Sequence, residues 1–446
     1  MLTMMGAVGL FMASSPQAAP VEMVDEADTQ ILDAYLKHVE SSSAYCTPDR
    51  MAQFAEQPED ITWQGALYIK MPLIAYELTE ETRYLDMFVE RMDALIGCIE
   101  TGPDGYKGWY GVALELFRHP DHPDAEVDVL LTSFFVSGLM ADCAVLARAD
   151  DGLNATCGEA ASRYLALATD HLVAKWDARG CYRELGDGGA VYTTNAALKP
   201  TKGSLTQPHN KHSKIIKSLL SLYKATGNDE YVVKASHLGT RYKRSLTLVG
   251  DRYSWHYWDP AGAWDINPDD TGAWKHWIGA EHRDGYYNLT LSMAVLLYEH
   301  GLLFDRADID RFLRTQMDVC WNGDTETPVF KRVDGEDTDK AYVCSALAPF
   351  DDRIYEMVCG APAQTERLSR KDHSWGGGPS AMGYLEFKYI TYPKWKSGDP
   401  AEADSLAPFL AKPKNQKLLD DLTFTIDDAN YSAPRTPAEM ENMPGR

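Results

Sequence analysis

The sequence has little positive charge for its length. Its 446 residues include 43 Lys and Arg against 66 Asp and Glu, which gives a formal net charge of −23. A surface of this sign argues against broad binding to nucleic acid or to an anionic membrane, because both need an exposed basic face. We therefore expect no nucleic-acid partner, and an anionic ligand must meet a local basic patch.

The sequence also lacks a recognisable metal or cofactor motif. Its eight cysteines contain no CxxC pair, which argues against a zinc ribbon or a thioredoxin-like site. The His-Pro-Asp repeat at residues 119–124 has metal-ligand residue types, but it lies in a proline-broken loop without ligand spacing. We expect neither metal nor cofactor. Cys143 with Cys157 and Cys320 with Cys344 are candidate disulfides, with buried free thiols as the alternative.

Long apolar runs are scarce as well. No internal stretch approaches the roughly 18 uninterrupted apolar residues of a membrane span, so no membrane insertion is expected. The start of the chain has an apolar run over residues 6–13 followed by small residues, as in a secretory signal, although no Lys or Arg precedes it. We expect a signal peptide over residues 1–20 and a secreted or periplasmic protein. An apolar N-terminus on a cytoplasmic protein is the alternative, and the oligomeric state is left open.

Helical periodicity dominates the rest of the chain. Apolar residues recur at helical spacing over residues 27–41, 62–77, 80–99, 127–149, 155–177, 206–226, 228–247, 286–302 and 306–320. Short polar turns join neighbouring helices, and longer connections separate the pairs. This layout predicts an all-α fold, an (α/α) toroid or incomplete barrel of helical hairpins, in which long loops at one end form a cleft. An open helical solenoid is the alternative.

We expect one catalytic domain over residues 21–425 and a disordered tail over residues 426–446, which is rich in Pro, Asn, Glu and Met. The loops expected to carry the chemistry are residues 100–126, 178–206, 248–280 and 321–376.

Two of the helix junctions resemble each other. The sequence Tyr76-Glu77-Leu78-Thr79 is followed by Tyr84, and Tyr223-Lys224-Ala225-Thr226 is followed by Tyr231 at the same spacing. A Thr that closes one helix and a Tyr in the first turn of the next can hold the junction together by packing. The match predicts one hairpin turn used twice.

A basic segment interrupts the acidic chain. Residues 188–228 contain no Asp or Glu but do contain Lys199, Lys202, Lys211, Lys214, Lys217 and Lys224. Part of this pattern can be a solvated helix face. Its functional interpretation is a positive field that attracts an anionic ligand.

Aromatic residues crowd the segment that follows. Between residues 253 and 287 the sequence has Tyr253, Trp255, Tyr257, Trp258, Trp264, Trp274, Trp277, Tyr286 and Tyr287. Aromatic faces stack against the C–H faces of sugars while their polar edges reach water. A satellite hydrophobic cluster under a long loop is the alternative.

Histidines mark three junctions in the same region. The junctions read Pro208-His209-Asn210-Lys211-His212, Trp255-His256-Tyr257-Trp258 and Glu281-His282-Arg283-Asp284-Gly285-Tyr286-Tyr287-Asn288. Such a set suits β-elimination on a uronic-acid polysaccharide, in which a hydrogen-bonding or positive group neutralises the carboxylate, a base takes the C5 proton and an acid protonates the leaving oxygen.

With this residue set and the helical-hairpin layout over residues 60–390, the chain resembles the toroidal polysaccharide lyases, nearest to the alginate and glucuronan type. The resemblance implies that Asn210 binds the carboxylate of an anionic polysaccharide and that His256 is neutraliser or base. It also implies Tyr286 as acid or base, with Arg283 as its electrostatic partner. His209, His212 or His282 can replace His256, and Tyr257 or Tyr287 can replace Tyr286.

Further residues are candidates for binding the sugar. They are His209, Lys211, His212, Trp255, Tyr257, Trp258, His282 and Tyr287, with Trp109 and Tyr110 in a Gly-rich loop and Trp63 at a helix start.

Three other functions remain open. The first is a glycoside hydrolase on the same kind of toroid, acting on uronides or unsaturated uronides, which needs two carboxylates. Its candidates are Asp128, Asp259, Asp265, Glu281 and Asp284. The second is a noncatalytic glycan-binding protein, for which the aromatic loop suffices. The third is a C5 epimerase, which shares the first proton abstraction with elimination.

Overall fold

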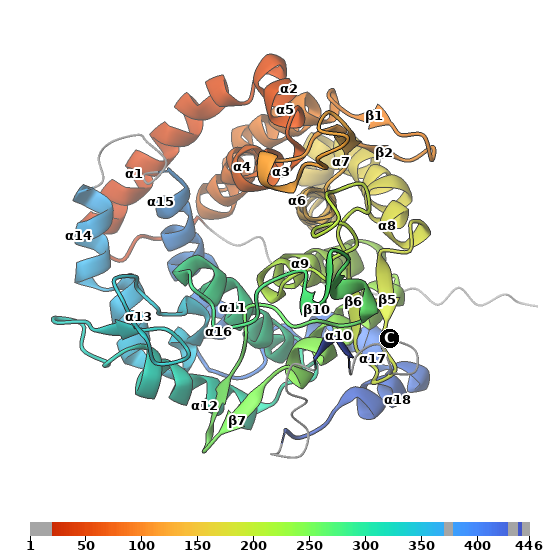
Figure 1. Ribbon diagram of the computed structural model, residues 1–446. Helices are drawn as coiled ribbons and strands as arrows, with labels where there is room; N and C mark the ends of the chain where they lie inside the picture. Colours follow the sequence, from red (N-terminus) through yellow and green to blue (C-terminus); the bar gives the residue numbers. More distant parts are fainter. Residues whose placement is uncertain (1–19, 370–377, 427–435, 439–446) are drawn as a thin grey trace, which may run out of the picture.

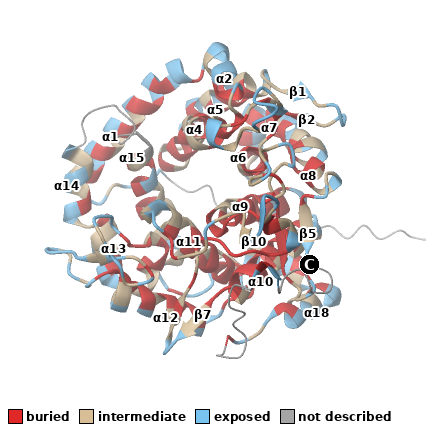
Figure 2. Ribbon diagram, in the orientation of Figure 1, coloured by how far each residue is buried: buried red, intermediate tan, exposed pale blue. Residues whose placement is uncertain are grey.

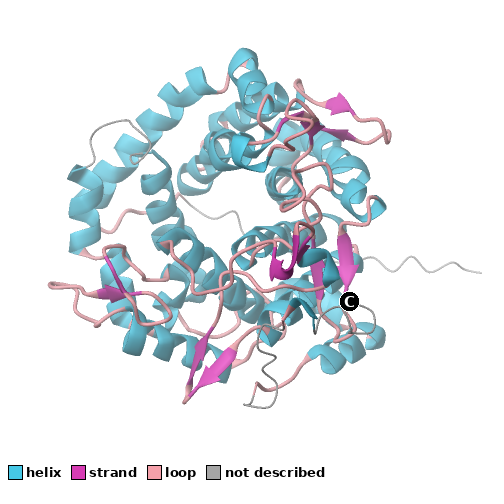
Figure 3. Ribbon diagram, viewed as in Figure 1, coloured by secondary structure: helices cyan, strands magenta, loops and turns pink. Residues whose placement is uncertain are grey.

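The fold is mostly helical. The computed structural model describes residues 20–369, 378–426 and 436–438, and within them strands occur only as six two-stranded antiparallel sheets (Figures 1 and 3). The expected all-α class is confirmed at this level. The predicted signal peptide and C-terminal tail lie almost entirely outside the described residues.

Each of the nine predicted helical blocks contains a helix. These helices are α1 Glu26–Ser41, α4 Ala66–Thr79, α5 Arg83–Ile96, α6 Leu130–Ala149, α7 Asp151–Leu167, α9 His209–Thr226, α10 Asp229–Arg244, α11 Asp284–Glu299 and α12 Arg306–Thr315. Helices adjacent in sequence pack as pairs, α4 with α5, α6 with α7, α9 with α10 and α11 with α12. In Figure 1 the pairs follow one another around the molecule.

The shorter helices were less visible in the sequence. They are α2 Pro48–Ala55, α3 Pro58–Asp60, α8 Ala174–Ala178, α13 Asp352–Cys359, α14 Ala361–Ser369, α15 Gly378–Leu385, α16 Tyr392–Trp395, α17 Ala407–Leu410 and α18 Pro413–Leu422. The expectation of a long loop over residues 321–376 is wrong for its second half, because this part contains α13 and α14. Helix α13 has a clear start signal, since the Asp351 side chain accepts a hydrogen bond from the Arg353 backbone N–H.

The remaining elements are short. Turns of π-helix lie at Ile61–Gly65, Ala168–Val173, Gln316–Cys320 and Glu386–Thr391, and 3₁₀ turns lie at Ser42–Tyr45, Glu115–Phe117, Ala263–Asp265, Ser345–Phe350 and Ala403–Leu406. The strand pairs are β1 Glu100–Thr101 with β2 Lys107–Gly108, β3 Gly111–Val112 with β4 Glu126–Val127, β5 Tyr182–Glu184 with β6 Ala190–Tyr192, β7 Thr247–Val249 with β8 Arg252–Ser254, β9 Ile266–Asn267 with β10 Asp270–Trp274, and β11 Phe330–Lys331 with β12 Asp337–Thr338. Most of these hairpins lie in the predicted long loops.

The repeated junction has the same geometry in both places. Thr79 Oγ1 donates to the Ala75 carbonyl at 2.8 Å, and Thr226 Oγ1 donates to the Leu222 carbonyl at 2.7 Å. The next residue is left-handed in each copy, Glu80 with φ of 58° and Gly227 with φ of 70°. The predicted repeat is therefore confirmed down to its hydrogen bonds.

The first helix packs against a segment from the C-terminal part of the chain. Helix α1 packs against α14 and α15 (Figure 1). The buried carboxylate of Asp28 on α1 receives Lys388 Nζ at 2.6 Å and Tyr384 Oη at 2.6 Å, and it also accepts a hydrogen bond from Tyr389. A buried charge that is paired and fully hydrogen-bonded ties the N-terminal helix to the C-terminal segment.

One contiguous apolar core runs from Ile31 to Ile426. Figure 2 shows its buried residues along α4, α6, α9 and α11. Helix α6 is apolar on most sides, as a helix in the interior must be. It is long and apolar enough to cross a membrane, but 78% of its most apolar window is buried inside the protein.

All eight cysteines are free thiols, and seven of them are buried. Of the candidate disulfides, Cys143 and Cys157 lie within hydrogen-bond contact where α6 packs on α7, but they are not bonded.

Candidate functional site

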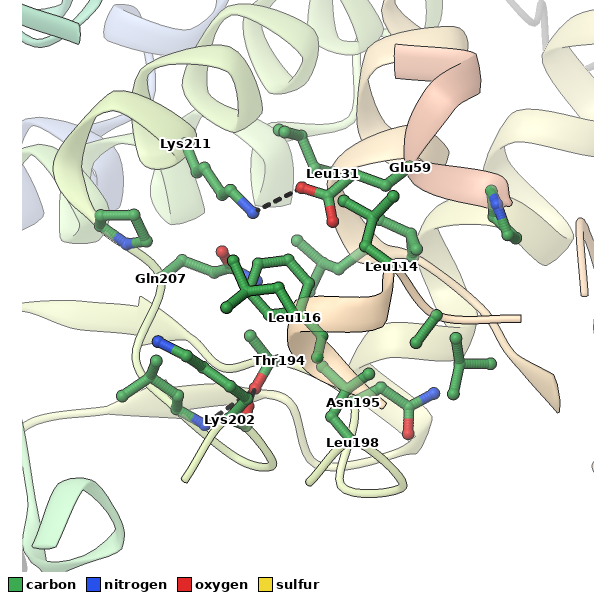
Figure 4. Close-up of a pocket in the computed structure, with 18 of the residues that line it drawn as sticks. Glu59, Leu114, Leu116, Leu131, Thr194, Asn195, Leu198, Lys202, Gln207 and Lys211 are labelled. Atoms are coloured by element: carbon green, nitrogen blue, oxygen red, sulfur yellow. Dashed lines mark hydrogen bonds and ion pairs between the residues drawn. The ribbon is translucent and has the colours of Figure 1, made fainter. Parts of the chain in front are cut away.

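A cavity of about 460 Å³ opens where the start of α9 faces the start of α11 and the loop around β3 and β4 (Figure 4). Its polar lining consists of Glu59, Asp128, Thr194, Asn195, Lys202, Gln207, Asn210, Lys211, Tyr257, His276, His282, Arg283 and Tyr286. Its apolar lining includes Trp63, Leu114, Leu116, Phe117, Leu131 and Leu198. Three of the four loops predicted to carry the chemistry contribute to this lining.

The first turn of α9 brings amide and amino groups to the cavity. Asn210 is buried, and its side-chain oxygen has no hydrogen-bond partner among the described residues, which is also true of the Gln207 side-chain oxygen. Buried polar atoms are normally paired, so these two amide oxygens are exceptions within the hydrogen bonding of the described residues. Lys211 Nζ lies 3.1 Å from Glu59 Oε1, the contact drawn in Figure 4.

The start of α11 brings a phenol and a guanidinium to the same cavity. Arg283 Nη1 donates to Tyr286 Oη at 3.3 Å, and the guanidinium lies 5.2 Å from the centre of the Tyr286 ring. The His282 ring meets the edge of Tyr286 with centroids 6.0 Å apart. The predicted residues Asn210, Arg283 and Tyr286 thus line one cavity although they begin two different helices.

The structure adds a histidine that the sequence interpretation did not single out. His276 lines the cavity and packs against Tyr257 and Trp258, with ring centroids 5.7 Å and 5.5 Å away. Burial, together with the positive charges of Lys202 and Lys211, lowers the pKa of His276 to about 4. Its position in the run Trp274-Lys275-His276-Trp277, inside the aromatic segment, is the signal that could have revealed it.

His282 is also held in its neutral form. Partial burial and the nearby positive charges of Arg283 and Arg332 lower its pKa. Within the described part of the chain, neither His276 nor His282 makes a hydrogen bond. The cavity therefore offers two neutral imidazoles whose lone pairs are free to accept a proton.

His256, the leading catalytic candidate, lies outside the cavity lining. Its Nδ1 donates to Asp259 Oδ1 at 3.0 Å, and His209 Nε2 contacts Asp259 Oδ2 at 3.2 Å. The hydrogen bond to Asp259 raises the pKa of His256. Although burial opposes it, hydrogen bonding from the two histidines holds the pKa of Asp259 below its usual range. The three residues form a hydrogen-bonded unit next to the start of α9.

His212 is similarly occupied by the fold. Its Nε2 accepts a hydrogen bond from the Tyr192 backbone N–H at 3.1 Å, and burial lowers its pKa to about 3. It does not line the cavity.

Most of the predicted sugar-binding aromatics also belong to the core. The buried ones are Trp109, Trp255, Tyr257, Trp258 and Tyr287, of which all but Tyr257 lie outside the cavity lining. The polar edge of each of the other four has an internal partner, as for Trp258 Nε1, which donates to the Thr206 carbonyl at 2.9 Å. Tyr110 accepts a hydrogen bond from Arg179 and lies outside the cavity lining. Of the predicted binding aromatics, Tyr257 and Trp63 line the cavity.

No protein-family model and no curated protein matches the chain. The chemistry of the cavity is therefore inferred from the functional groups of its lining residues. These are three amides, two phenols of which one lies beside a guanidinium, two imidazoles, and the ammonium groups of Lys202 and Lys211.

The carboxylates are poorly placed for hydrolysis. Of the five candidates only Asp128 lines the cavity, and it is held at 2.6 Å by the buried Lys175 and at 2.9 Å by Arg179. Glu59 lines the cavity too, paired with Lys211. Across the described ranges, no three His, Cys, Asp or Glu side chains are grouped so as to hold a metal ion.

Proposed function

We propose that the protein is a lyase that cleaves a uronic-acid-containing polysaccharide, of alginate or glucuronan type, by β-elimination. The observation that carries the proposal is the meeting of Asn210, His282, Arg283 and Tyr286 around one cavity. In the proposed reaction a base removes the C5 proton, the C4–O bond breaks as the C4=C5 double bond forms, and the departing oxygen takes a proton.

The carboxylate next to C5 must be neutralised before that proton becomes acidic. Lys202 and Arg283 line the cavity. Within the described residues, neither the Lys202 ammonium nor the Arg283 guanidinium forms an ion pair. Asn210 adds a buried amide. Preorganised donors of this kind stabilise the negative charge that develops on the carboxylate in the transition state.

The proton transfers are assigned to neutral groups. His276 or His282 is the proposed base, because an imidazole that is already unprotonated can accept the C5 proton directly. Tyr286 is the proposed acid, because its phenol lies within hydrogen-bond reach of Arg283, which stabilises the phenolate after the proton has left. His256 is no longer the proposed base, since it is engaged with Asp259 away from the cavity.

Retaining or inverting hydrolysis is less well supported, because both carboxylates at the cavity are already engaged in ion pairs. Epimerisation shares the first step and is separated by its product.

The proposal includes the arrangement of the helices and the cellular location of the protein. We infer a closed (α/α) toroid from the consecutive helix pairs and from the packing of α1 against α14 and α15. An exported protein would meet such a polymer outside the cell.

The test is incubation of the purified protein with alginate, glucuronan, pectate, ulvan and glycosaminoglycans, followed by absorbance of the unsaturated product in the ultraviolet. Rising absorbance with falling chain length supports the lyase. Depolymerisation without absorbance indicates hydrolysis, and inverted C5 configuration at constant chain length indicates epimerisation. Binding without any change in the polymer indicates a glycan-binding protein.

A further inference from the structure

A second cavity, of about 500 Å³, lies along α9 and α11. It is nearer to the C-terminal ends of these helices than the first cavity. Helix α9 contributes Asn210 and Lys211 to the first cavity and then Lys214 and Lys217 to the second. Because these lysines are three residues apart, they lie along one face of the helix. The basic segment of the sequence is thus divided between two cavities.

The second cavity contains more positive groups than its own acids neutralise. Its lining has five lysines and four acids. Lys70 is paired with Glu386, and Glu402 accepts both Lys224 at 3.0 Å and Lys394 at 4.0 Å. Within the described part of the chain, Lys214 and Lys217 have no ion-pair partner. The Lys214 ammonium instead lies 4.9 Å from the centre of the Phe135 ring.

The two lysines differ in their surroundings, because Glu386, Asp142 and Glu77 raise the pKa of Lys217 although burial opposes it, whereas Lys214 is destabilised by Lys217. Burial, Lys217 and Lys70 together lower the pKa of Lys214 to about 7. Lys217 is exposed to water within the cavity. An anion placed between the two ammonium groups would offset this effect of Lys217 on Lys214, since paired charges stabilise each other where isolated ones do not.

The rest of the lining indicates what kind of anion fits. Hydroxyl groups come from Ser213, Ser221 and Thr391, and a flat apolar face comes from Trp395. Asp142 and Glu77 would repel a densely charged ligand such as a polyphosphate. Hydroxyls, one aromatic ring and a small positive excess suit a molecule that has several hydroxyl groups and a single carboxylate.

We propose that this second cavity is a binding site for a small hydroxylated carboxylate of the sugar-acid class, held between Lys214 and Lys217. The site is separate from the proposed catalytic cavity and does not depend on lyase activity.

Binding should be stronger at lower pH. The charged groups around Lys214 in this cavity come from four elements. They are Lys217 on α9, Lys70 and Glu77 on α4, Asp142 on α6, and Glu386 on the π turn that follows α15. Lys214 is charged at a pH well below 7 and loses its charge as the pH rises through about 7, so the affinity for a carboxylate falls over the same range.

The experiment uses the full chain with its lysines methylated by ¹³C reductive methylation, which keeps their charge. The methyl signals of Lys214 and Lys217 are assigned with Lys214→Met and Lys217→Met, and sodium glucuronate, glucose and inorganic phosphate are titrated separately. We expect glucuronate to shift both signals to saturation, glucose to shift neither, and phosphate to act more weakly. Absence of a saturable shift, or equal shifts with glucose or phosphate, would overturn the proposal.

Calorimetry on unmethylated protein gives a second, independent measurement. Each Met variant should weaken glucuronate binding about tenfold or more, the effect of losing a charge-assisted hydrogen bond. Lys37→Met on the exposed face of α1 is the matched control and should bind as the parent does. Lys217→Arg keeps the charge and should retain binding. Loss of glucuronate binding in this variant, if it is folded, also contradicts the proposal. No polysaccharide is present, and failure of the lyase assay therefore leaves this result unaffected.

Discussion

The ring of Tyr257 stacks on the ring of Tyr286, with centroids 5.3 Å apart and planes inclined by 19°. The contact fixes the Tyr286 ring from one face, while the Arg283 guanidinium lies 5.2 Å from its centre. The Tyr286 hydroxyl is thereby oriented at the cavity.

Removal of this hydroxyl should abolish most of the proposed activity. We expect Tyr286→Phe to lower kcat by about 10²–10⁴-fold, the usual contribution of a positioned acid or base. The phenyl ring still stacks, so the thermal unfolding midpoint should not change. Tyr257→Phe is the control because it removes a hydroxyl from the stacked partner, and an equal loss there would contradict the assignment of the acid to Tyr286.

The pH dependence should identify the base. If His276 or His282 accepts the proton, kcat/KM falls on the acid side through a pKa below 6.5, because both groups have lowered pKa values and must be unprotonated. His276→Gln and His282→Gln, assayed separately, should show which imidazole sets that limb. If kcat/KM instead falls through an apparent pKa above 6.5, and this fall is absent in His256→Gln, the base is His256, whose pKa is raised.

The buried Glu281 should destabilise the protein as the pH rises. Burial raises its pKa to about 8, although Thr290 and Trp255 donate hydrogen bonds to it. An acid whose pKa is higher in the folded than in the unfolded state favours folding at low pH, and this advantage is lost between about pH 4.5 and 8.

Glu281→Gln should therefore raise the free energy of unfolding at pH 7.5 by a few kcal/mol, an order-of-magnitude figure from the size of the shift. Urea unfolding at pH 5 and pH 7.5 checks it. The variant should gain much more at the higher pH, and an equal effect at both would show that Glu281 is not protonated in the folded protein.

Replacement of Glu80, the left-handed residue in the first copy of the repeated junction, should stabilise the protein. Glu80 has a φ of 58°, which costs a residue with a β-carbon about 1–2 kcal/mol, whereas Gly227 adopts the equivalent conformation without that cost. We expect Glu80→Gly to raise the free energy of unfolding by roughly 0.5–1 kcal/mol after the added freedom of the unfolded chain is counted. Gly227→Ala is the reciprocal variant and should lower it by a similar amount. Thermal unfolding of both measures the difference.

The helices could be predicted because their signals are local. The nine long blocks have apolar residues at helical spacing, and the repeated turn shows itself in four or five residue types at fixed distances. The helices of the C-terminal third are short and amphipathic over only two turns, so the apolar pattern from Asp352 to Ser369 cannot be distinguished from a loop by periodicity alone.

The site was predicted only in part because burial is a tertiary property. Asn210, Arg283 and Tyr286 lie at the starts of two helices, and all three line the cavity. His256 and Trp255 lie in an equally suggestive motif, but the chain direction at that point turns them toward Asp259 and Glu281. His276 stands in the aromatic run Trp274-Lys275-His276-Trp277, but only the fold shows that it lines the cavity.

Asp28 and Lys388 are 360 residues apart in the chain and 2.6 Å apart in space. On a ribosome, α1 is made long before the partner of its buried carboxylate exists. Until α15 and the turn after it have been synthesised, Asp28 must stay in water, and the first helix cannot settle in its final place. The packing of α1 against this C-terminal segment is a contact of very large sequence separation, and we expect such a contact to form slowly. A nascent chain that stops before residue 388 should remain open to proteases at α1, whatever the state of the helices between.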